Sequence, residues 1–369
     1  MSLRFLHAAD LHLDSPFEGL PSGKAAVRRS EQRMLLQRMA ALVKEQELQL
    51  VLLPGDLLDS EWSFAETGEA LCACFRQMGV PVFIAPGNHD WYSAHSPYAR
   101  LPLPENVHVF KKNALESVTI PALGVRVYGA AYLGQDSPAL LGGFRAARGS
   151  ETLDLLCLHG EVTKAASPYA PIREEELAAS GLHYAALGHV HQASGLRRAG
   201  KTWYSWPGCP EGRGFDECGE KTVSIVELSG TDCTLRPVSI ARRRYEILNV
   251  NVTGSDPLLA VHSQLPDETA RDVYRIVLSG EVDSPPDLRR LQLNLGELFY
   301  ALQLRDETRL RQNVWDRAGE DSLRGLFLKK LREAAEGASP EERARIEQAA
   351  RWGLAALDRR EEVLTHDHS

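Results

Sequence analysis

The chain has 369 residues, of which 43% are hydrophobic and 25% charged, and its formal net charge is −8. This composition predicts a globular protein of two or three domains and excludes collagen-like, disordered and disulfide-framework proteins. An acidic chain repels nucleic acid, so a nucleic-acid function would need local basic patches or bound cations. No apolar run is long enough for a membrane span, and the N-terminus lacks a signal-peptide pattern, so we expect a cytoplasmic protein with no membrane partner.

The first 240 residues alternate short apolar runs with helical patterns. Helical spacing predicts helices over residues 24–47 and 64–78. The apolar runs predict strands over residues 3–7, 50–53, 81–85, 107–109, 118–120, 125–128, 153–158, 203–206 and 222–228. Alternation of this kind predicts an α/β protein with helices on the faces of its sheet.

The pattern changes near residue 241. Strands over residues 245–252 and 273–279, with a helix from Asp287, predict a small α+β module. Residues 319–360 predict a helical hairpin, whose second helix begins with a capping box of Ser339 and Glu342. We therefore expect three domains, over residues 1–240, 241–312 and 313–369.

Five polar motifs each follow a short apolar run, the last of these runs being Ala185-Ala186-Leu187. The motifs are residues 10–12, 55–59, 87–90, 159–160 and 188–191. Each motif alone also has a structural explanation, as a turn or as a buried histidine. Together they place seven oxygen and nitrogen donors at strand ends, where functional sites usually lie. These donors are Asp10, His12, Asp56, Asn88, His159, His189 and His191.

This donor set predicts two divalent cations, with manganese, iron or zinc favoured over calcium. A structural zinc site is not expected, because the set contains no thiolate. Asp56 is placed to bridge a pair of ions about 3.5–4 Å apart, the spacing of two-metal phosphoesterases.

The ordered motifs resemble the signature of calcineurin-like metallophosphoesterases. Residues 7–16 and 207–213 further resemble the bacterial SbcD/YhaO branch, the nuclease subunits of DNA-repair complexes with SMC-like ATPases. The resemblance covers residues 1–230, and beyond them it is one of architecture only. It implies a four-layer α/β/β/α sandwich with a small α+β capping domain and a C-terminal helical hairpin. It also implies a homodimer, double-stranded DNA ends as substrate and an SbcC/YhaN-like ATPase as partner.

The resemblance also assigns roles to individual residues. It implies that one metal is held by Asp10, His12, Asp56 and His191. It implies that the second metal is held by Asp56, Asn88, His159 and His189.

His89 is implied to be a catalytic residue that is not a ligand, since it would stabilise the transferring phosphate and protonate the leaving oxygen. Asp90 would orient the His89 imidazole. The roles of Asp59 and Cys209 stay open, because relatives vary at these two positions. Arg213 is a candidate for binding DNA phosphates, and a solvated charge cluster is the alternative.

Two further patterns have competing explanations. Residues 195–202 match the spelling of a P-loop, but β-like residues and a proline follow where a helix is required, so we predict a hairpin turn at Ala199-Gly200. The apolar stripe of the last predicted helix suits either packing within its own domain or docking a partner helix. The resemblance favours the coiled coil of the ATPase.

The donor set, together with what the resemblance implies, predicts a manganese-dependent dinuclear DNA phosphodiesterase. It would act on double-stranded ends as a 3′-to-5′ exonuclease, with endonuclease activity left open. Two alternatives remain: a small-molecule phosphoesterase with the same metal site, and a mainly non-catalytic scaffold that tethers DNA ends.

Overall fold

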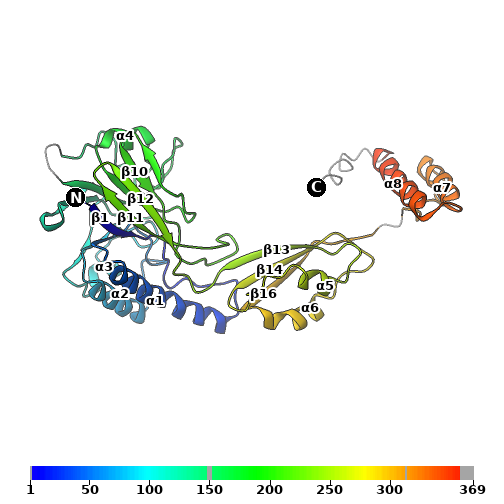
Figure 1. The fold of residues 1–369 in the computed structure, drawn as a ribbon, viewed down its shortest axis with the longest axis horizontal. Helices are drawn as coiled ribbons and strands as arrows, with labels where there is room; N and C mark the ends of the chain where they lie inside the picture. Colours follow the sequence, from blue (N-terminus) through cyan, green and yellow to red (C-terminus); the bar gives the residue numbers. More distant parts are fainter. Residues whose placement is uncertain (1, 148–151, 312–313, 358–369) are drawn as a thin grey trace. The chain divides into compact units, whose positions relative to one another are not determined.

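The computed structural model describes residues 2–147, 152–311 and 314–357. Two six-stranded sheets pack face to face between layers of helix (Figure 1). The first sheet has the order β12-β11-β1-β2-β3-β4, and its strands are β1 (Ser2–His7), β2 (Leu50–Leu53), β3 (Val82–Ile84), β4 (Val107–Val109), β11 (Val223–Ser229) and β12 (Asp232–Val238). Strands β1 to β4 are parallel, whereas β11 and β12 extend the sheet in antiparallel pairs.

The second sheet has the order β5-β6-β7-β8-β10-β9. Its strands are β5 (Glu116–Ile120), β6 (Val125–Gly129), β7 (Leu153–His159), β8 (Tyr184–Gly188), β9 (Arg197–Ala199) and β10 (Thr202–Ser205). Strands β6, β7, β8 and β10 are parallel. Strands β9 and β10 form the predicted hairpin, in which Gly200 adopts a φ of +58°, so the P-loop spelling is not a nucleotide loop.

The side chains of the first sheet alternate between its two faces, and each face packs against a different layer. Phe5 and Leu52 face the second sheet and form a fully buried core with Tyr184. Their neighbours Leu6 and Val51 point to the opposite face, because successive side chains of a strand alternate. That outer face is covered by α1 (Ser22–Glu45) and α2 (Ala65–Met78), while α4 (Glu174–Ser180) covers the second sheet; α3 (Pro97–Arg100) and a 3₁₀ turn (Pro121–Leu123) complete this part. The predicted α/β sandwich is confirmed.

The remaining elements follow residue 244. Strands β13 (Tyr245–Asn251), β14 (Val273–Ser279) and β16 (Ala301–Asp306) form a sheet in the order β13-β14-β16, and β15 (Glu281–Val282) pairs with β17 (Arg309–Leu310). The helices are α5 (Pro257–His262), α6 (Leu288–Leu295), a 3₁₀ turn (Gly296–Leu298), α7 (Leu323–Ala335) and α8 (Pro340–Leu357).

Helices α7 and α8 pack closely where Phe327 covers Gly353. A Cβ on Gly353 would lie 2.2 Å from the Phe327 ring, so the contact requires glycine. The predicted capping box starts α8, since the Ser339 N–H donates to Glu342 and the Glu342 N–H donates to Ser339 Oγ. Residues 358–360 of the predicted hairpin, like residues 312–313 and 361–369 of the expected domains, lie outside the described residues.

The chain divides into two compact units. One contains residues up to Leu248 together with Leu265–Val277 and Arg289–Arg305, and the other contains Asn249–Gln264, Leu278–Leu288 and the chain from Asp306 onward. Among the described helices, none combines the length and the hydropathy needed to cross a bilayer.

Candidate metal centre

All the predicted donors follow the carboxyl ends of parallel strands. Those of the first sheet come after β1, β2 and β3, and those of the second come at the ends of β7 and β8. The two sets meet directly: the His189 N–H donates to the Asp10 carboxylate at 3.0 Å, and His159 Nδ1 lies 3.0 Å from the carbonyl oxygen of Pro54. Ligand sites of open α/β sheets form at this edge.

The backbone at this edge is strained. Asp10, His12, Asp56 and His189 adopt φ values of +54°, +43°, +49° and +95°, in the region that favours glycine. A Cβ on Gly188 would lie 1.8 Å from the Pro54 carbonyl oxygen, so only glycine allows the two sheets to approach here. Strain of this kind persists only where surrounding structure enforces it, and it is concentrated at functional sites.

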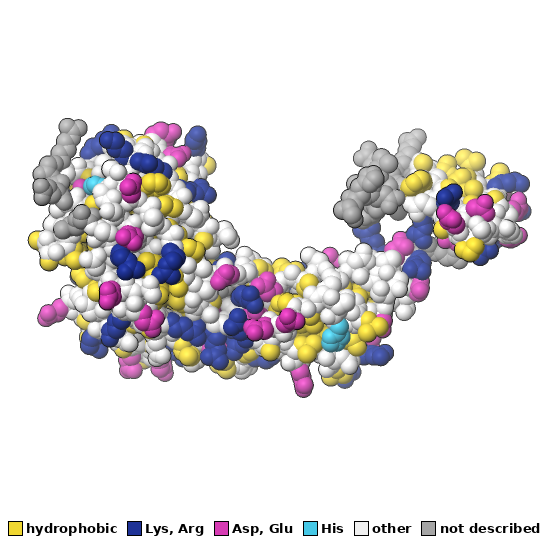
Figure 2. Space-filling model, viewed as in Figure 1, with side chains coloured by type: hydrophobic (Ala, Val, Ile, Leu, Met, Phe, Trp, Pro, Cys, Tyr) yellow, Lys and Arg dark blue, Asp and Glu magenta, His cyan; other side chains and the backbone are white. Residues whose placement is uncertain are grey.

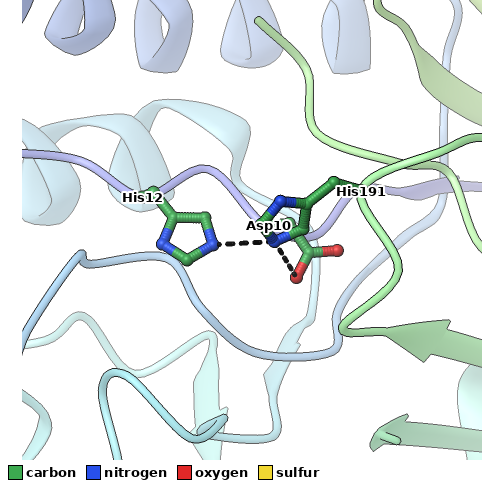
Figure 3. A group of neighbouring side chains, drawn as sticks. All are labelled: Asp10, His12 and His191. Carbon is green, nitrogen blue, oxygen red and sulfur yellow. Dashed lines mark hydrogen bonds and ion pairs between the residues drawn. The ribbon is translucent and has the colours of Figure 1, made fainter. Parts of the chain in front are cut away.

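The first half of the centre contains Asp10, His12 and His191 (Figure 3). The imidazoles point toward each other, with their Nε2 atoms 3.1 Å apart, and His191 Nε2 lies 4.0 Å from Asp10 Oδ1. One nitrogen or oxygen from each of the three residues lies within 4.8 Å of the others. Such a group has the size and the donor types of a cation site.

The second half contains Asn88, His159 and His189. Asn88 Oδ1 lies 2.8 Å from His159 Nε2 and 3.3 Å from His189 Nδ1. Asp56 joins the two halves, because its Oδ2 lies 3.7 Å from His12 Nε2 and 3.4 Å from His159 Nε2. The structure therefore brings all seven predicted donors into one cluster.

The ionisation states suit divalent cations. Burial lowers the pKa of His12, His159 and His189 to about 4, so these imidazoles are neutral at pH 7 and keep a lone pair for a metal. Burial, and then the nearby Asp56, raise the pKa of Asp10. Two buried carboxylates this close repel each other unless a cation neutralises them, so the residues present fit divalent metal ions.

Outer contacts fix the imidazoles of the first half. His12 Nδ1 lies 3.0 Å from Asp59 Oδ1, and His191 Nδ1 lies 2.7 Å from Glu217 Oε1. Arg213 donates to both carboxylates, at 3.0 Å to Asp59 and 2.7 Å to Glu217. Burial alone would raise the pKa of Glu217, but hydrogen bonds from His191 and Arg213 lower it far below its usual range.

This network changes the expectation for Arg213. Its side chain is only 21% exposed and its guanidinium already pairs with two carboxylates, so it positions Asp59 and Glu217 instead of standing free for a DNA phosphate. The same contacts give Asp59 a role that the sequence left open, because its carboxylate contacts His12 and accepts from Arg213. Glu217 was missed, and its only sequence signal was its place four residues after Arg213.

The expected contact between Asp90 and the His89 imidazole is wrong. The buried Asp90 carboxylate accepts from the backbone N–H groups of Asp56, Leu57 and Leu58 at 3.2, 2.7 and 3.2 Å, and from the Tyr98 hydroxyl. It therefore holds the loop after β2. Its position next to His89 in the chain suggested the other role, but consecutive side chains point to different sides.

The His89 side chain is exposed and lies beside the first half. Its Nδ1 is 3.2 Å from the carbonyl oxygen of Asp59, and its ring meets His12 edge-on, with centroids 4.8 Å apart. Cys209 is buried, and its N–H donates to the carbonyl oxygen of His191 at 3.2 Å, so its backbone supports the first half.

A profile of calcineurin-like phosphoesterases matches residues 3–193. The chain belongs to this family. Membership makes it a hydrolase of the metallophosphoesterase type, in agreement with the prediction from the motifs.

Two curated relatives extend the match beyond the family domain of this metallophosphoesterase. It is 29% identical over 338 residues to the uncharacterized metallophosphoesterase YhaO of Bacillus subtilis, covering 85% of this chain and 80% of the relative. It is 25% identical over 287 residues to the SbcD subunit of the nuclease SbcCD of the same organism, covering 65% and 70%.

Solved structures also resemble this metallophosphoesterase. The protein TT1561 of Thermus thermophilus matches with a TM-score of 0.38 at 12% identity, over 64% of this chain and 99% of that one. A dimetal phosphatase from Danio rerio matches with a TM-score of 0.42 at 13% identity, over 64% and 95%.

Proposed function

We propose that this metallophosphoesterase is a manganese-dependent dinuclear DNA nuclease that acts in double-strand break repair. It would degrade double-stranded ends as a 3′-to-5′ exonuclease, with endonuclease action as a further activity to test. The observation that carries the proposal is the shared carboxylate of Asp56, which faces an imidazole of each half at 3.7 and 3.4 Å. A bridging carboxylate between two nitrogen-rich sites is typical of two-metal phosphoesterases.

Each half would hold one ion. The first would be held by Asp10, His12, Asp56 and His191, and the second by Asp56, Asn88, His159 and His189. A bound pair supplies a nucleophilic hydroxide near neutral pH and neutralises phosphate charge. His89 is exposed beside the first half, so its imidazole is available to donate a proton to the leaving oxygen.

The partner proposals rest on the relatives and on the C-terminal helices. The similarity to the SbcD subunit of the nuclease SbcCD supports DNA as substrate and an SbcC/YhaN-like SMC-type ATPase as partner. We propose further that the protein is a homodimer. Residues 241–312 would form the DNA-recognising cap, and residues 313–369 the partner-binding segment. Hydrophobic side chains gather on α7 and α8 (Figure 2), where Leu323, Leu326 and Trp352 are 70%, 57% and 49% exposed.

A small phosphodiester is the second candidate substrate. The observation that favours it is the cleft beside His89, whose ten described lining residues include neither lysine nor arginine. A long polyanion gains most of its affinity from such cations, whereas a small ester does not need them.

The experiment is degradation of a linear DNA duplex with added Mn²⁺ by the wild-type protein, by His89→Ala and by the control His95→Ala, an exposed histidine on the same loop. We expect His89→Ala to lose about 10²–10⁴-fold in rate, the usual contribution of a general acid, while still binding Mn²⁺. His95→Ala should behave as wild type. Wild-type turnover of small phosphodiesters without any DNA cleavage would favour the second candidate instead.

A further inference from the structure

A cleft of about 450 Å³ opens beside the metal centre. This volume lies within the range of small-molecule sites, about 300–1,000 Å³. Two centre residues, Asn88 and His89, form part of its wall. The remaining lining residues are Asp59, Ser60, Glu61, Trp62, Trp91, Gln135, Asp136 and Tyr169.

Three of the lining side chains are aromatic, namely Trp62, Trp91 and Tyr169. Trp62 is 63% exposed, although burial of an indole is strongly favourable. The Trp62 backbone is held by Ser60, whose hydroxyl donates to the Trp62 carbonyl oxygen at 3.0 Å and accepts from the Trp62 backbone N–H at 3.3 Å. An exposed indole on a backbone held in this way is prepared to stack on a flat ligand.

The polar groups that line the cleft determine which flat ligands it can bind. Asp59, Glu61 and Asp136 are its carboxylates, and the described lining contains neither lysine nor arginine. Phosphate would be repelled from these walls. A neutral heterocycle with amino N–H donors would be accepted, because carboxylates and the Gln135 amide oxygen accept hydrogen bonds.

Tyr169 lines the cleft and also contacts the metal centre. The Tyr169 ring packs on the His189 imidazole, with centroids 4.6 Å apart and an angle of 36° between the planes. A phosphodiester held at the centre would therefore place one of its two substituents beside these aromatic side chains.

We propose that this cleft holds the unpaired base of the nucleotide next to the scissile phosphate, with Trp62 as the stacking surface. This inference rests on the proposed phosphodiesterase function and adds that the enzyme reads a nucleobase at the end of the strand. A base inside a duplex has no free face, so the terminal base must leave its pair to enter. Ends that are frayed or mismatched are then better substrates than fully paired ends.

The test compares two duplexes that differ only in the last 3′ nucleotide, which carries either a mismatched base or an abasic tetrahydrofuran. Loss of one base–aromatic stack weakens binding about tenfold. We expect the wild-type protein to remove the base-carrying nucleotide about tenfold faster in kcat/KM, and Trp62→Leu to abolish this ratio. Trp62→Phe should retain most of it, and Phe64→Leu, which removes another exposed aromatic ring that does not line the cleft, should keep the wild-type ratio.

A binding arm separates this inference from the proposed nuclease activity. With Mn²⁺ present, calorimetry measures deoxyadenosine 5′-monophosphate against deoxyribose 5-phosphate. A preference for the nucleotide that disappears in Trp62→Leu supports the cleft even if no protein cleaves DNA, an outcome that would reject only the nuclease. An unchanged base preference in Trp62→Leu, in cleavage or in binding, would overturn the inference.

Discussion

The two halves of the metal centre use different supports for chemically similar imidazoles. In the first half, the outer nitrogens of His12 and His191 contact the carboxylates of Asp59 and Glu217 at 3.0 and 2.7 Å. In the second half, the outer nitrogen of His159 contacts a backbone carbonyl oxygen, that of Pro54, at 3.0 Å.

The groups behind the imidazoles influence how tightly each half binds its metal ion. A carboxylate behind an imidazole fixes the tautomer and raises the basicity of the ligating nitrogen, whereas a carbonyl fixes the tautomer with less charge. We therefore expect the first half to hold its cation more tightly. Two sites that are equivalent in ligand type should then differ in affinity because of the groups behind their ligands.

The largest effect is expected from Asp56, whose carboxylate both halves share. Asp56→Asn should weaken both ions and lower phosphodiesterase activity about 10³-fold, since each loses several kcal/mol of charge stabilisation. Mn²⁺ stoichiometry from electron paramagnetic resonance and duplex degradation measure the effect. The metal-free variant should melt at a higher temperature than wild type, because Asp10 loses a buried like-charged neighbour.

The control for that variant is Asp232→Asn, which changes an exposed carboxylate on β12. It should leave stoichiometry, activity and melting temperature at their wild-type values. Two ions bound by Asp56→Asn with wild-type affinity would contradict the bridging role.

A second variant changes only the first half, at the carboxylate behind His191. Glu217→Gln should weaken the more tightly bound of the two ions about 10–100-fold, the usual effect of a lost carboxylate behind a ligating histidine, and leave the other ion unchanged. Titration calorimetry with Mn²⁺ resolves the two affinities. Glu220→Gln, an exposed change on the same loop, is the matched control, and equal weakening of both ions by Glu217→Gln would show that the halves are not independent.

The smallest effect comes from a buried imidazole outside the centre. His7 contacts the Tyr184 hydroxyl and the Leu187 carbonyl oxygen at 3.0 and 3.1 Å, and burial lowers its pKa from 6.5 to about 3. Between these two pH values the unfolded chain binds a proton that the folded chain does not. This histidine therefore reduces the free energy of unfolding as the pH falls from 6.5 toward 3, by up to about 1.4 kcal/mol per pH unit.

His7→Gln removes that titration and keeps a hydrogen-bonding side chain. Urea unfolding with a chelator present should show a shallower loss of stability between about pH 6 and pH 4.5, by up to about 1.4 kcal/mol per unit. His262→Gln, at an exposed position, should retain the wild-type slope. An unchanged slope in His7→Gln would mean that the buried ligand histidines alone cause the acid sensitivity.

The strands that lead into the metal centre and the seven donors were predictable because both depend on local patterns, whereas β12 and β16 were not predicted. Apolar runs give β1, β2, β3, β7 and β8, and parallel strands bring their carboxyl ends to one edge. The outer network was not predictable in the same way. Asp59 and Glu217 meet through Arg213, and no spacing rule relates Arg213 to Asp59, which lies 154 positions earlier in the chain.

The role of Asp90 shows a second limit of the sequence. Its motif placed it beside His89, but its carboxylate points to the loop after β2, and only the backbone direction decides between these two arrangements. Residue type and strand position can be inferred locally, whereas the direction of a side chain in an irregular loop depends on the assembled fold.

The closeness of His12 and His191 also bears on how the protein folds. Their imidazoles are neighbours although 179 residues separate them in the chain, and they belong to loops that follow strands of different sheets. Such a contact forms late, because closing so long a loop costs entropy that only the docked sheets offset. We therefore expect metal uptake to follow the docking of the two sheets, so a chain arrested with one sheet formed would lack its cations.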